Sequence, residues 1–124
     1  MMNFTEDKPS SDIFFKEYTD GVLKLNIGDF TSSLVLSKDS LLAEDNGIST
    51  LDNITDSHLD MLLESNPEII LIGTGPKQEI PTVEIINYLA KKGLSADFMT
   101  TNAACKTYNL LINENRNVSA IFIV

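Results

Sequence analysis

The chain has 124 residues, of which 43% are hydrophobic and 22% charged, and it carries a formal net charge of −9. These proportions are those of an ordinary globular protein and exclude an intrinsically disordered chain or a large multidomain enzyme. The excess of acidic residues argues against nonspecific binding to nucleic acid and against adhesion to anionic membranes, because both need a basic surface. It favours basic partners instead.

No stretch of the sequence approaches the ~18 consecutive apolar residues of a membrane span, so we predict no direct insertion into a membrane. The polar, acidic N-terminus is unlike a signal peptide or an Arg-rich transit peptide, and we expect a cytoplasmic protein. Cys105 is the only cysteine and His58 the only histidine. One chain therefore cannot form a disulfide or a Cys/His zinc site.

Residues 1–11 are predicted to form a flexible tail and residues 12–124 a single α/β domain. The first half of that domain is predicted to be a β meander, because turn signals separate short runs of β-forming residues. The turns are expected at Thr19-Asp20-Gly21, Gly28-Asp29 and Ser37-Lys38-Asp39. The strands are expected over residues 13–18, 22–26, 30–36 and 40–43.

The second half alternates helices and strands. Thr55 and either Thr100 or Thr101 are expected to cap helices, and Pro81 to occupy a first helical turn. Short links between a strand, a helix and the next strand predict parallel crossovers. The predicted elements are a helix over 55–65, a strand over 68–73, a helix from Pro81 to a cap at Gly93, a strand over 94–99, a helix ending near Asn113 and a strand over 118–124.

The loop after residues 68–73 lies at the carboxyl end of a predicted buried strand, where α/β sheets bind ligands. Gly73 and Gly75 would let backbone N–H groups approach an anion, although a structural turn explains the same glycines. The dinucleotide-binding fingerprint fails, because Gln78 stands where its third glycine belongs. Lys77 and Gln78 suit contact with a carboxylate or phosphate, the alternative being that they are simply solvated.

Other reactive residues favour structural interpretations. Cys105 falls among apolar residues on its helix, which favours a buried, inert thiol over a nucleophile. Asp52, Asp56 and Asp60 favour a solvated acidic helix start over a metal site, because His58 points away from Asp56 and Asp60 on the helical wheel. No Gly-x-Ser-x-Gly turn is present. We therefore assign no catalytic residue, no metal ligand and no cofactor.

Two segments carry a resemblance to a known family: Ile69–Gly75 (IILIGTG), followed by Gln78 and Pro81, and Met99–Leu111 (MTTNAACKTYNLL). They resemble the small family of domains of unknown function that includes the mitochondrial complex I (NADH dehydrogenase) assembly factor 3 and short bacterial and archaeal proteins. The resemblance extends over about Phe14 to Val124. We therefore expect a bacterial member of this family.

The resemblance implies a three-layer α/β fold with a mixed central β-sheet, flanking helices and an additional N-terminal β-meander layer. It implies no established catalytic activity and no cofactor. Many relatives have glycine shortly after the last helix, where this chain has Glu114-Asn115-Arg116. Asn115 is expected to take the left-handed conformation that glycine would fill.

The first functional hypothesis is a noncatalytic binding module that helps assemble a respiratory or membrane-associated complex, with protein partners among the components of that complex. Its surface is expected at the carboxyl ends of two adjacent strands, which should share one crevice. The predicted binding residues are Gly73, Thr74, Gly75, Lys77, Gln78, Thr100, Thr101 and Asn102.

Two alternatives stay open. One is a small-anion or metabolite-binding protein, or a weak enzyme, that uses the Gly73–Gln78 crevice with Lys77 as the charge and the loop amides as an anion hole. The other is a homodimer whose β layer pairs edge to edge.

Overall fold

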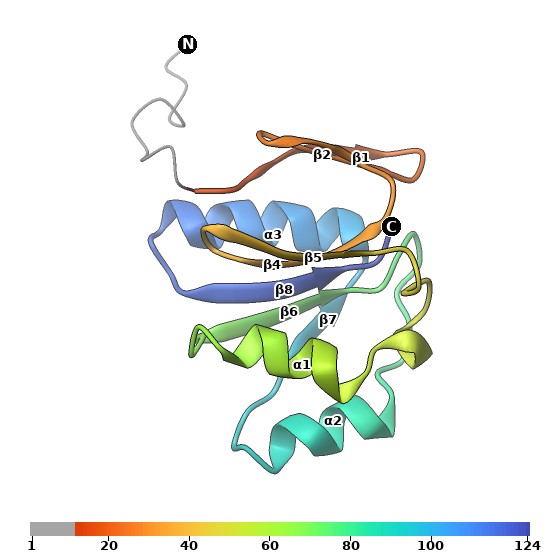
Figure 1. Ribbon diagram of the computed structural model, residues 1–124, viewed down its shortest axis with the longest axis vertical. Coiled ribbons are helices and arrows are strands. Elements are labelled where there is room, and N and C mark those ends of the chain that lie inside the picture. Colours follow the sequence, from red (N-terminus) through yellow and green to blue (C-terminus); the bar gives the residue numbers. More distant parts are fainter. Residues whose placement is uncertain (1–11) are drawn as a thin grey trace.

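The computed structural model describes residues 12–124, and the predicted tail over residues 1–11 lies outside them. The described chain forms two β-sheets and three α-helices (Figure 1). The first sheet is an antiparallel meander of β1 (Phe15–Thr19), β2 (Val22–Leu25) and β3 (Gly28–Phe30). The second is a mixed sheet of five strands. The predicted fold class is confirmed.

The second sheet has the strand order β5-β4-β8-β6-β7. β6 lies parallel to both β7 and β8, whereas β4 runs antiparallel to β5 and β8. Helices join the parallel strands, while a tight turn joins β4 to β5 and therefore makes that pair antiparallel. The bounds are β4 Ser33–Ser37, β5 Ser40–Asp45, β6 Ile69–Gly73, β7 Asp97–Met99 and β8 Val118–Phe122.

The predicted turn at Gly28-Asp29 is wrong, and the strand predicted over residues 30–36 begins only at Ser33, as β4. Gly28 and Asp29 begin β3, and the chain turns two residues earlier, at Asn26 and Ile27. At this turn the Asn26 side chain accepts a hydrogen bond from the N–H of Phe14 at 2.9 Å, and the backbone N–H of Asn26 donates to the carbonyl of Phe14 at 3.1 Å. The strand β3 then ends at Phe30, and β3 and β4 belong to different sheets.

Threonine caps all three α-helices of the described chain, namely α1 (Asp56–Leu63), α2 (Val83–Ala90) and α3 (Thr101–Asn113). The hydroxyls of Thr55, Thr82 and Thr100 accept the N–H groups of His58, Ile85 and Ala103, respectively. Thr55 was predicted as a cap, and the structure selects Thr100 from the two candidates, Thr100 and Thr101, that the sequence left open for α3. Pro81 was not placed correctly, because Thr82 provides the cap and Pro81 therefore precedes the helix.

The ends of two helices depend on left-handed residues. Gly93 has φ 75° after α2, and the N–H of Leu94 donates to the carbonyl of Leu89 at 2.9 Å. Leu94 was predicted to start a strand, but its N–H is occupied by this bond to the helix. The strand β7 begins only at Asp97. Asn115 has φ 62° after α3, as predicted.

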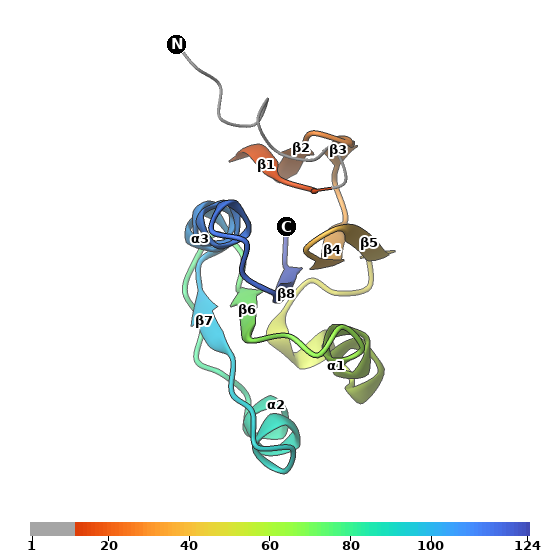
Figure 2. The ribbon, with the colours of Figure 1, turned by 90° about the vertical axis from the view of Figure 1, so that its left-hand side faces the viewer.

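The large sheet carries an apolar core on each face. Alternate residues along β4 point to opposite sides, with Leu34 and Leu36 in one core and Val35 in the other. The first core lies between the large sheet, α3 and the small sheet, and the second lies beneath α1 and α2 (Figure 2). This layering leaves the carboxyl ends of β6 and β7 at one edge of the molecule.

Candidate functional site

The two predicted segments lie side by side at the carboxyl ends of β6 and β7. The N–H of Thr74 donates to the carbonyl of Met99 at 2.8 Å, and the N–H of Thr101 donates to the carbonyl of Gly75 at 2.9 Å. The N–H of Gly75 in turn donates to the Thr101 hydroxyl at 2.8 Å. The loop after β6 is therefore attached directly to the start of α3.

These bonds use groups that were predicted to face a ligand. The N–H groups of Thr74 and Gly75 both donate within the protein, so they do not form the proposed anion hole. Thr101 is fully buried, and its hydroxyl also donates to the carbonyl of Ile123. Its role in this structure is to hold the loop rather than to face the surface.

Gly73 is required by the close approach of α3 to β6. A Cβ atom at this position would lie 2.9 Å from the Thr101 hydroxyl oxygen and 3.1 Å from the Cβ of Ala104. Real Cβ atoms do not tolerate the shorter of these contacts, which explains why the strand ends in glycine. Gly73 thus allows the two segments to meet, and it is itself buried.

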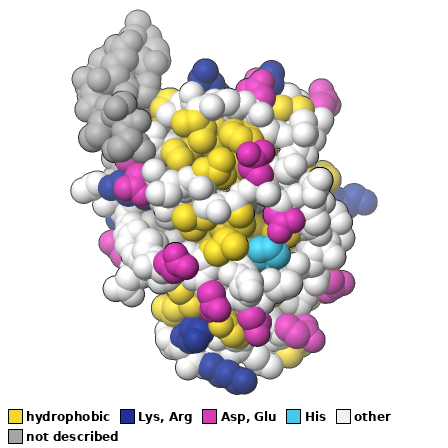
Figure 3. Space-filling model, in the orientation of Figure 1, with side chains coloured by type: hydrophobic (Ala, Val, Ile, Leu, Met, Phe, Trp, Pro, Cys, Tyr) yellow, Lys and Arg dark blue, Asp and Glu magenta, His cyan; other side chains and the backbone are white. Residues whose placement is uncertain are grey.

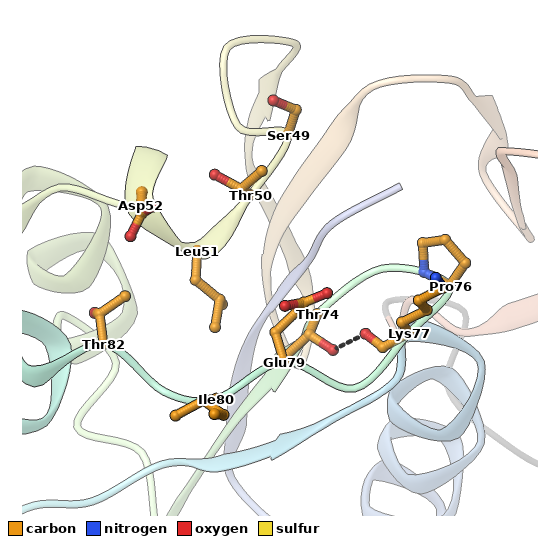
Figure 4. Close-up of a pocket in the computed structure, with 10 residues that line it drawn as sticks. All are labelled: Ser49, Thr50, Leu51, Asp52, Thr74, Pro76, Lys77, Glu79, Ile80 and Thr82. Atoms are coloured by element: carbon orange, nitrogen blue, oxygen red, sulfur yellow. Dashed lines mark hydrogen bonds between the residues drawn. The ribbon is translucent and has the colours of Figure 1, made fainter.

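One groove lies on the α1 and α2 side of the loop, and we call it the loop groove (Figure 4). It has a volume of about 360 Å³. A short 3₁₀ helix at Leu51–Asn53 forms one wall, and the loop that leads from β6 to α2 forms the other. Its lining residues are Ser49, Thr50, Leu51, Asp52, Thr74, Pro76, Lys77, Glu79, Ile80 and Thr82.

A second groove lies on the α3 side of the loop and has a volume of about 550 Å³. The turn between β1 and β2 forms its opposite wall. Its lining residues are Tyr18, Thr19, Asp20, Gly21, Gly75, Pro76, Thr100, Asn102 and Val124. Pro76 lines both grooves and separates them.

The prediction of a single crevice is therefore wrong, because the loop after β6 separates two grooves. Thr74 and Lys77 line the loop groove, whereas Gly75, Thr100 and Asn102 line the second groove. Gln78 is exposed and lines neither of these two grooves, and its side-chain amide lies 3.5 Å from the carbonyl of Phe98.

The wall formed by residues 49–52 was not predicted to belong to the site. Thr50 begins a capping box in which the Asn53 side chain accepts the N–H groups of Ser49 and Thr50, both at 3.0 Å. A threonine followed three residues later by a polar acceptor is a local signal for such a turn. That signal predicts a helical turn but not its position beside the loop.

Cys105 lies in the interior, with 4% of its surface exposed. Burial raises the pKa of its thiol to about 12, so the thiol stays protonated at neutral pH. Since the thiolate is the reactive form, this environment disfavours nucleophilic chemistry. The expectation of a buried thiol on the apolar face of the helix is confirmed.

His58 links α1 to β5 instead of joining the acidic residues on its own helix. Its Nε2 donates to Asp45 at 2.8 Å, and its Nδ1 accepts the N–H of Thr55 at 3.0 Å. This pairing fits the neutral tautomer with the proton on Nε2. Figure 3 shows the histidine, in cyan, on a face where acidic side chains surround exposed apolar surface.

Replacing Asp45 with asparagine is expected to make stability less dependent on pH in acid. The hydrogen bond from His58, followed by the N–H of Gly47, lowers the pKa of Asp45 below its ordinary value of 3.8. A carboxylate with a lowered folded-state pKa stabilises the fold above its unfolded pKa, and that stabilisation is lost as the pH falls through the folded pKa. Urea midpoints measured between about pH 5 and about pH 2 should therefore fall more steeply in the wild type than in the variant.

Asp29→Asn is the control for this experiment, because it makes the same charge change at an exposed position of β3. Its urea midpoints should follow those of the wild type. Identical slopes for Asp45→Asn and the wild type would contradict the assigned hydrogen bond.

A meander sheet packed against α3, beside a mixed sheet with two further helices, defines a two-sheet α/β protein of the Mth938-like fold. The Mth938-like domain of Bordetella pertussis has a TM-score of 0.75 at 24% identity, covering 94% of this chain and 88% of that domain. The chain belongs to the family described as "Protein of unknown function (DUF498/DUF598)", whose model matches residues 15–123. The resemblance found in the sequence is thereby confirmed.

Two further solved structures are similar over nearly their whole lengths. A Bordetella parapertussis protein has a TM-score of 0.80 at 26% identity, covering 93% of this chain and 98% of its own. A Xanthomonas campestris protein has a TM-score of 0.77 at 29% identity, covering 95% of this chain and 90% of its own. Bacterial proteins therefore share the fold.

Curated relatives fall into two groups. The "13 kDa major membrane protein" of Francisella tularensis subsp. holarctica (strain LVS) is 54% identical over 99% of this chain and 100% of its own length. The zebrafish (Danio rerio) "NADH dehydrogenase (ubiquinone) 1 alpha subcomplex assembly factor 3" is 36% identical over 50% of this chain and 36% of its own length. The human counterpart is 32% identical over 50% of this chain, a match that spans about a third (34%) of its own length.

Within residues 12–124, no helix has both the length and the apolar character needed to cross a membrane. The Francisella relative is nevertheless named a membrane protein. A cytoplasmic location therefore stays a prediction.

Proposed function

We propose that this protein is a noncatalytic binding module that helps assemble a respiratory or membrane-associated protein complex. Two relatives support the proposal: one is named an assembly factor of NADH dehydrogenase, and the other a major membrane protein. The proposal gives the protein a partner-binding role without a chemical step.

The loop groove is the surface that we assign to the partner. Its exposed side chains stand on a backbone that is already held in place, since the Thr74 hydroxyl donates to the carbonyl of Lys77 at 2.6 Å and the Thr74 N–H donates to Met99. A preorganised loop loses less conformational freedom when a partner binds. The groove is therefore suited to recognition by its fixed shape.

The observation that carries the proposal is the mixed character of this surface. Ile80 is 88% exposed, although it is a large apolar side chain. Charged groups adjoin it, with Lys77, Glu79 and Asp52 lining the same groove. Exposed apolar surface with a charged rim is typical of a protein interface.

Reversing the charge of Lys77 with Lys77→Glu is expected to reduce partner recovery about fivefold, since an unfavourable rim charge weakens binding by about 1 kcal/mol. The measurement is quantitative mass spectrometry of proteins that copurify with the tagged chain from its native lysate after crosslinking. Lys16→Glu is the control, because it makes the same charge change at an exposed position of β1.

Equal recovery with Lys77→Glu and the wild type would exclude the loop groove as the contact surface. The assembly role itself fails if the wild type recovers no partner and a metabolite screen raises its melting temperature. That result would favour the alternative of a metabolite-binding protein.

A further inference from the structure

The outer face of α2 exposes apolar side chains at one end of the molecule, together with the polar side chain of Asn87. Figures 1 and 2 both place α2 at the extremity, beyond α1 and the large sheet. Its inner face is buried through Ile85 and Leu89, which are 2% and 1% exposed. On the outer face, Val83 is 65% exposed and Ile86 is 47% exposed.

Hydrogen bonds hold α2 against α1 and cap its first turn. The Tyr88 hydroxyl donates to Asp60 of α1 and so joins the two helices. This bond raises the pKa of Tyr88 to about 12, which keeps the hydroxyl protonated as a donor at neutral pH. The helix is capped at its start by Thr82, whose hydroxyl accepts the N–H of Ile85 at 3.2 Å. A partner would therefore meet a helix that is already formed.

One negative and one positive side chain, Glu84 and Lys91, lie beside the apolar stripe of Val83, Ile86 and Ala90. The surface can therefore be complementary to a second copy of itself. Glu84 and Lys91 are seven residues apart, so they lie on the same flank of the helix about two turns from each other. Val83 and Ala90 have the same spacing along the stripe. Within residues 12–124 the ion pairs join His58 to Asp45 and Arg116 to Glu68, so Glu84 and Lys91 take part in neither.

Antiparallel packing of two such helices satisfies both patterns at once. A twofold axis beside Asn87 places Val83 of one copy level with Ala90 of the other. The same axis brings Glu84 close to Lys91 of the second copy, and it does so twice. In parallel packing the twofold axis would place the Glu84–Lys91 flanks of the two copies on opposite sides of the contact, so only the antiparallel arrangement pairs these charges with each other.

We propose that the protein self-associates through this α2 face, defined as Val83, Glu84, Ile86, Ala90 and Lys91, with a second copy of the chain as the partner. α2 has eight residues, so the contact is only about 12 Å long. A small interface and a net charge of −9 on each copy both limit affinity. The dissociation constant is expected to be on the order of 100 μM.

Sedimentation equilibrium of the full chain from about 10 μM to about 1 mM tests the proposal. The wild type should show a monomer–dimer equilibrium. Glu84→Lys should lower the association constant at least about tenfold by placing two lysines together at each contact. It should do so even though the net charge per copy falls in magnitude from −9 to −7 (−9 + 2), which by itself favours association.

Lys91→Glu should weaken association to a similar extent, and the double variant Glu84→Lys/Lys91→Glu should restore it by exchanging the two charges. Lys106→Glu is the control for the added negative charge, because it lies at an exposed position of α3. For the apolar stripe, Val83→Asp should abolish dimers, whereas Leu110→Asp, at an α3 side chain that is 58% exposed, should not.

All of these positions are exposed, and circular dichroism of each variant verifies that it is folded. A wild type that stays monomeric at the highest concentration would overturn the proposal. So would a dimer that none of the α2 variants affects, a result that favours pairing of strand edges. Failure of the double variant to restore association would also overturn the antiparallel charge pairing.

Discussion

Replacing Tyr108 with alanine is expected to lower the free energy of unfolding by about 4 kcal/mol, because the change empties a space in the centre of the first core. Tyr108 is fully buried. Its ring packs edge-on against Phe15 and Phe122, with ring centroids at 5.7 Å and 5.4 Å. One side chain thus joins α3 to both sheets.

The hydroxyl of Tyr108 adds a second contribution. It donates to the carbonyl of Ser37 at 2.6 Å, and burial raises the pKa of the phenol so that it remains a donor. Tyr108→Phe keeps the ring but leaves the carbonyl without this donor, and it should therefore cost about 1–2 kcal/mol.

Urea unfolding of the wild type and both Tyr108 variants gives the two contributions separately. Leu110→Ala, at an exposed position on the same helix, is the control and should change stability by less than about 0.5 kcal/mol. A loss below about 2 kcal/mol for Tyr108→Ala would contradict the central position assigned to this ring.

Thr101→Val is expected to lower the free energy of unfolding by about 3 kcal/mol, since it leaves two buried polar groups without a partner. The lost hydroxyl accepts the N–H of Gly75 and donates to the carbonyl of Ile123. Valine has nearly the same shape, so the effect reports the hydrogen bonds rather than a cavity.

Urea unfolding measures the stability loss, and hydrogen exchange at the Gly75 amide measures how firmly the loop is held. Exchange should be at least about tenfold faster in Thr101→Val. Thr101→Ser keeps the hydroxyl and is the matched control, expected to lose about 1 kcal/mol for the buried methyl group. Equal losses for the valine and serine variants would show that the hydroxyl does not hold the loop.

Local signals predicted the parts of the fold whose cause lies within a few residues. Thr55 and Thr100 cap their helices, and Asn115 takes the left-handed conformation after α3. The apolar run before Gly73 forms an interior strand of the large sheet, between β8 and β7. Each of these features depends on backbone conformation or burial that neighbouring residues determine directly.

The division of the meander between two sheets was not predicted. A run of β-forming residues from Phe30 to Leu36 has no local stop signal, yet Phe30 pairs with Leu23 and Leu34 pairs with Phe122. Strand partners that are distant in the sequence decide where the chain changes sheets. Residues 49–52 were missed for the same reason, because only packing brings them to the loop between β6 and α2.

The amino-acid sequence by itself determined the alternation of helices and strands, the family, and the meeting of the loop after β6 with the start of α3. Tertiary structure alone decided that the Gly75 N–H donates to the Thr101 hydroxyl, that Pro76 separates two grooves where one crevice was expected, and that the outer face of α2 stays exposed. The physical reason is that periodicity and capping depend on neighbouring residues, whereas a hydrogen-bond partner or an exposed face depends on which distant segments fill the space beside it.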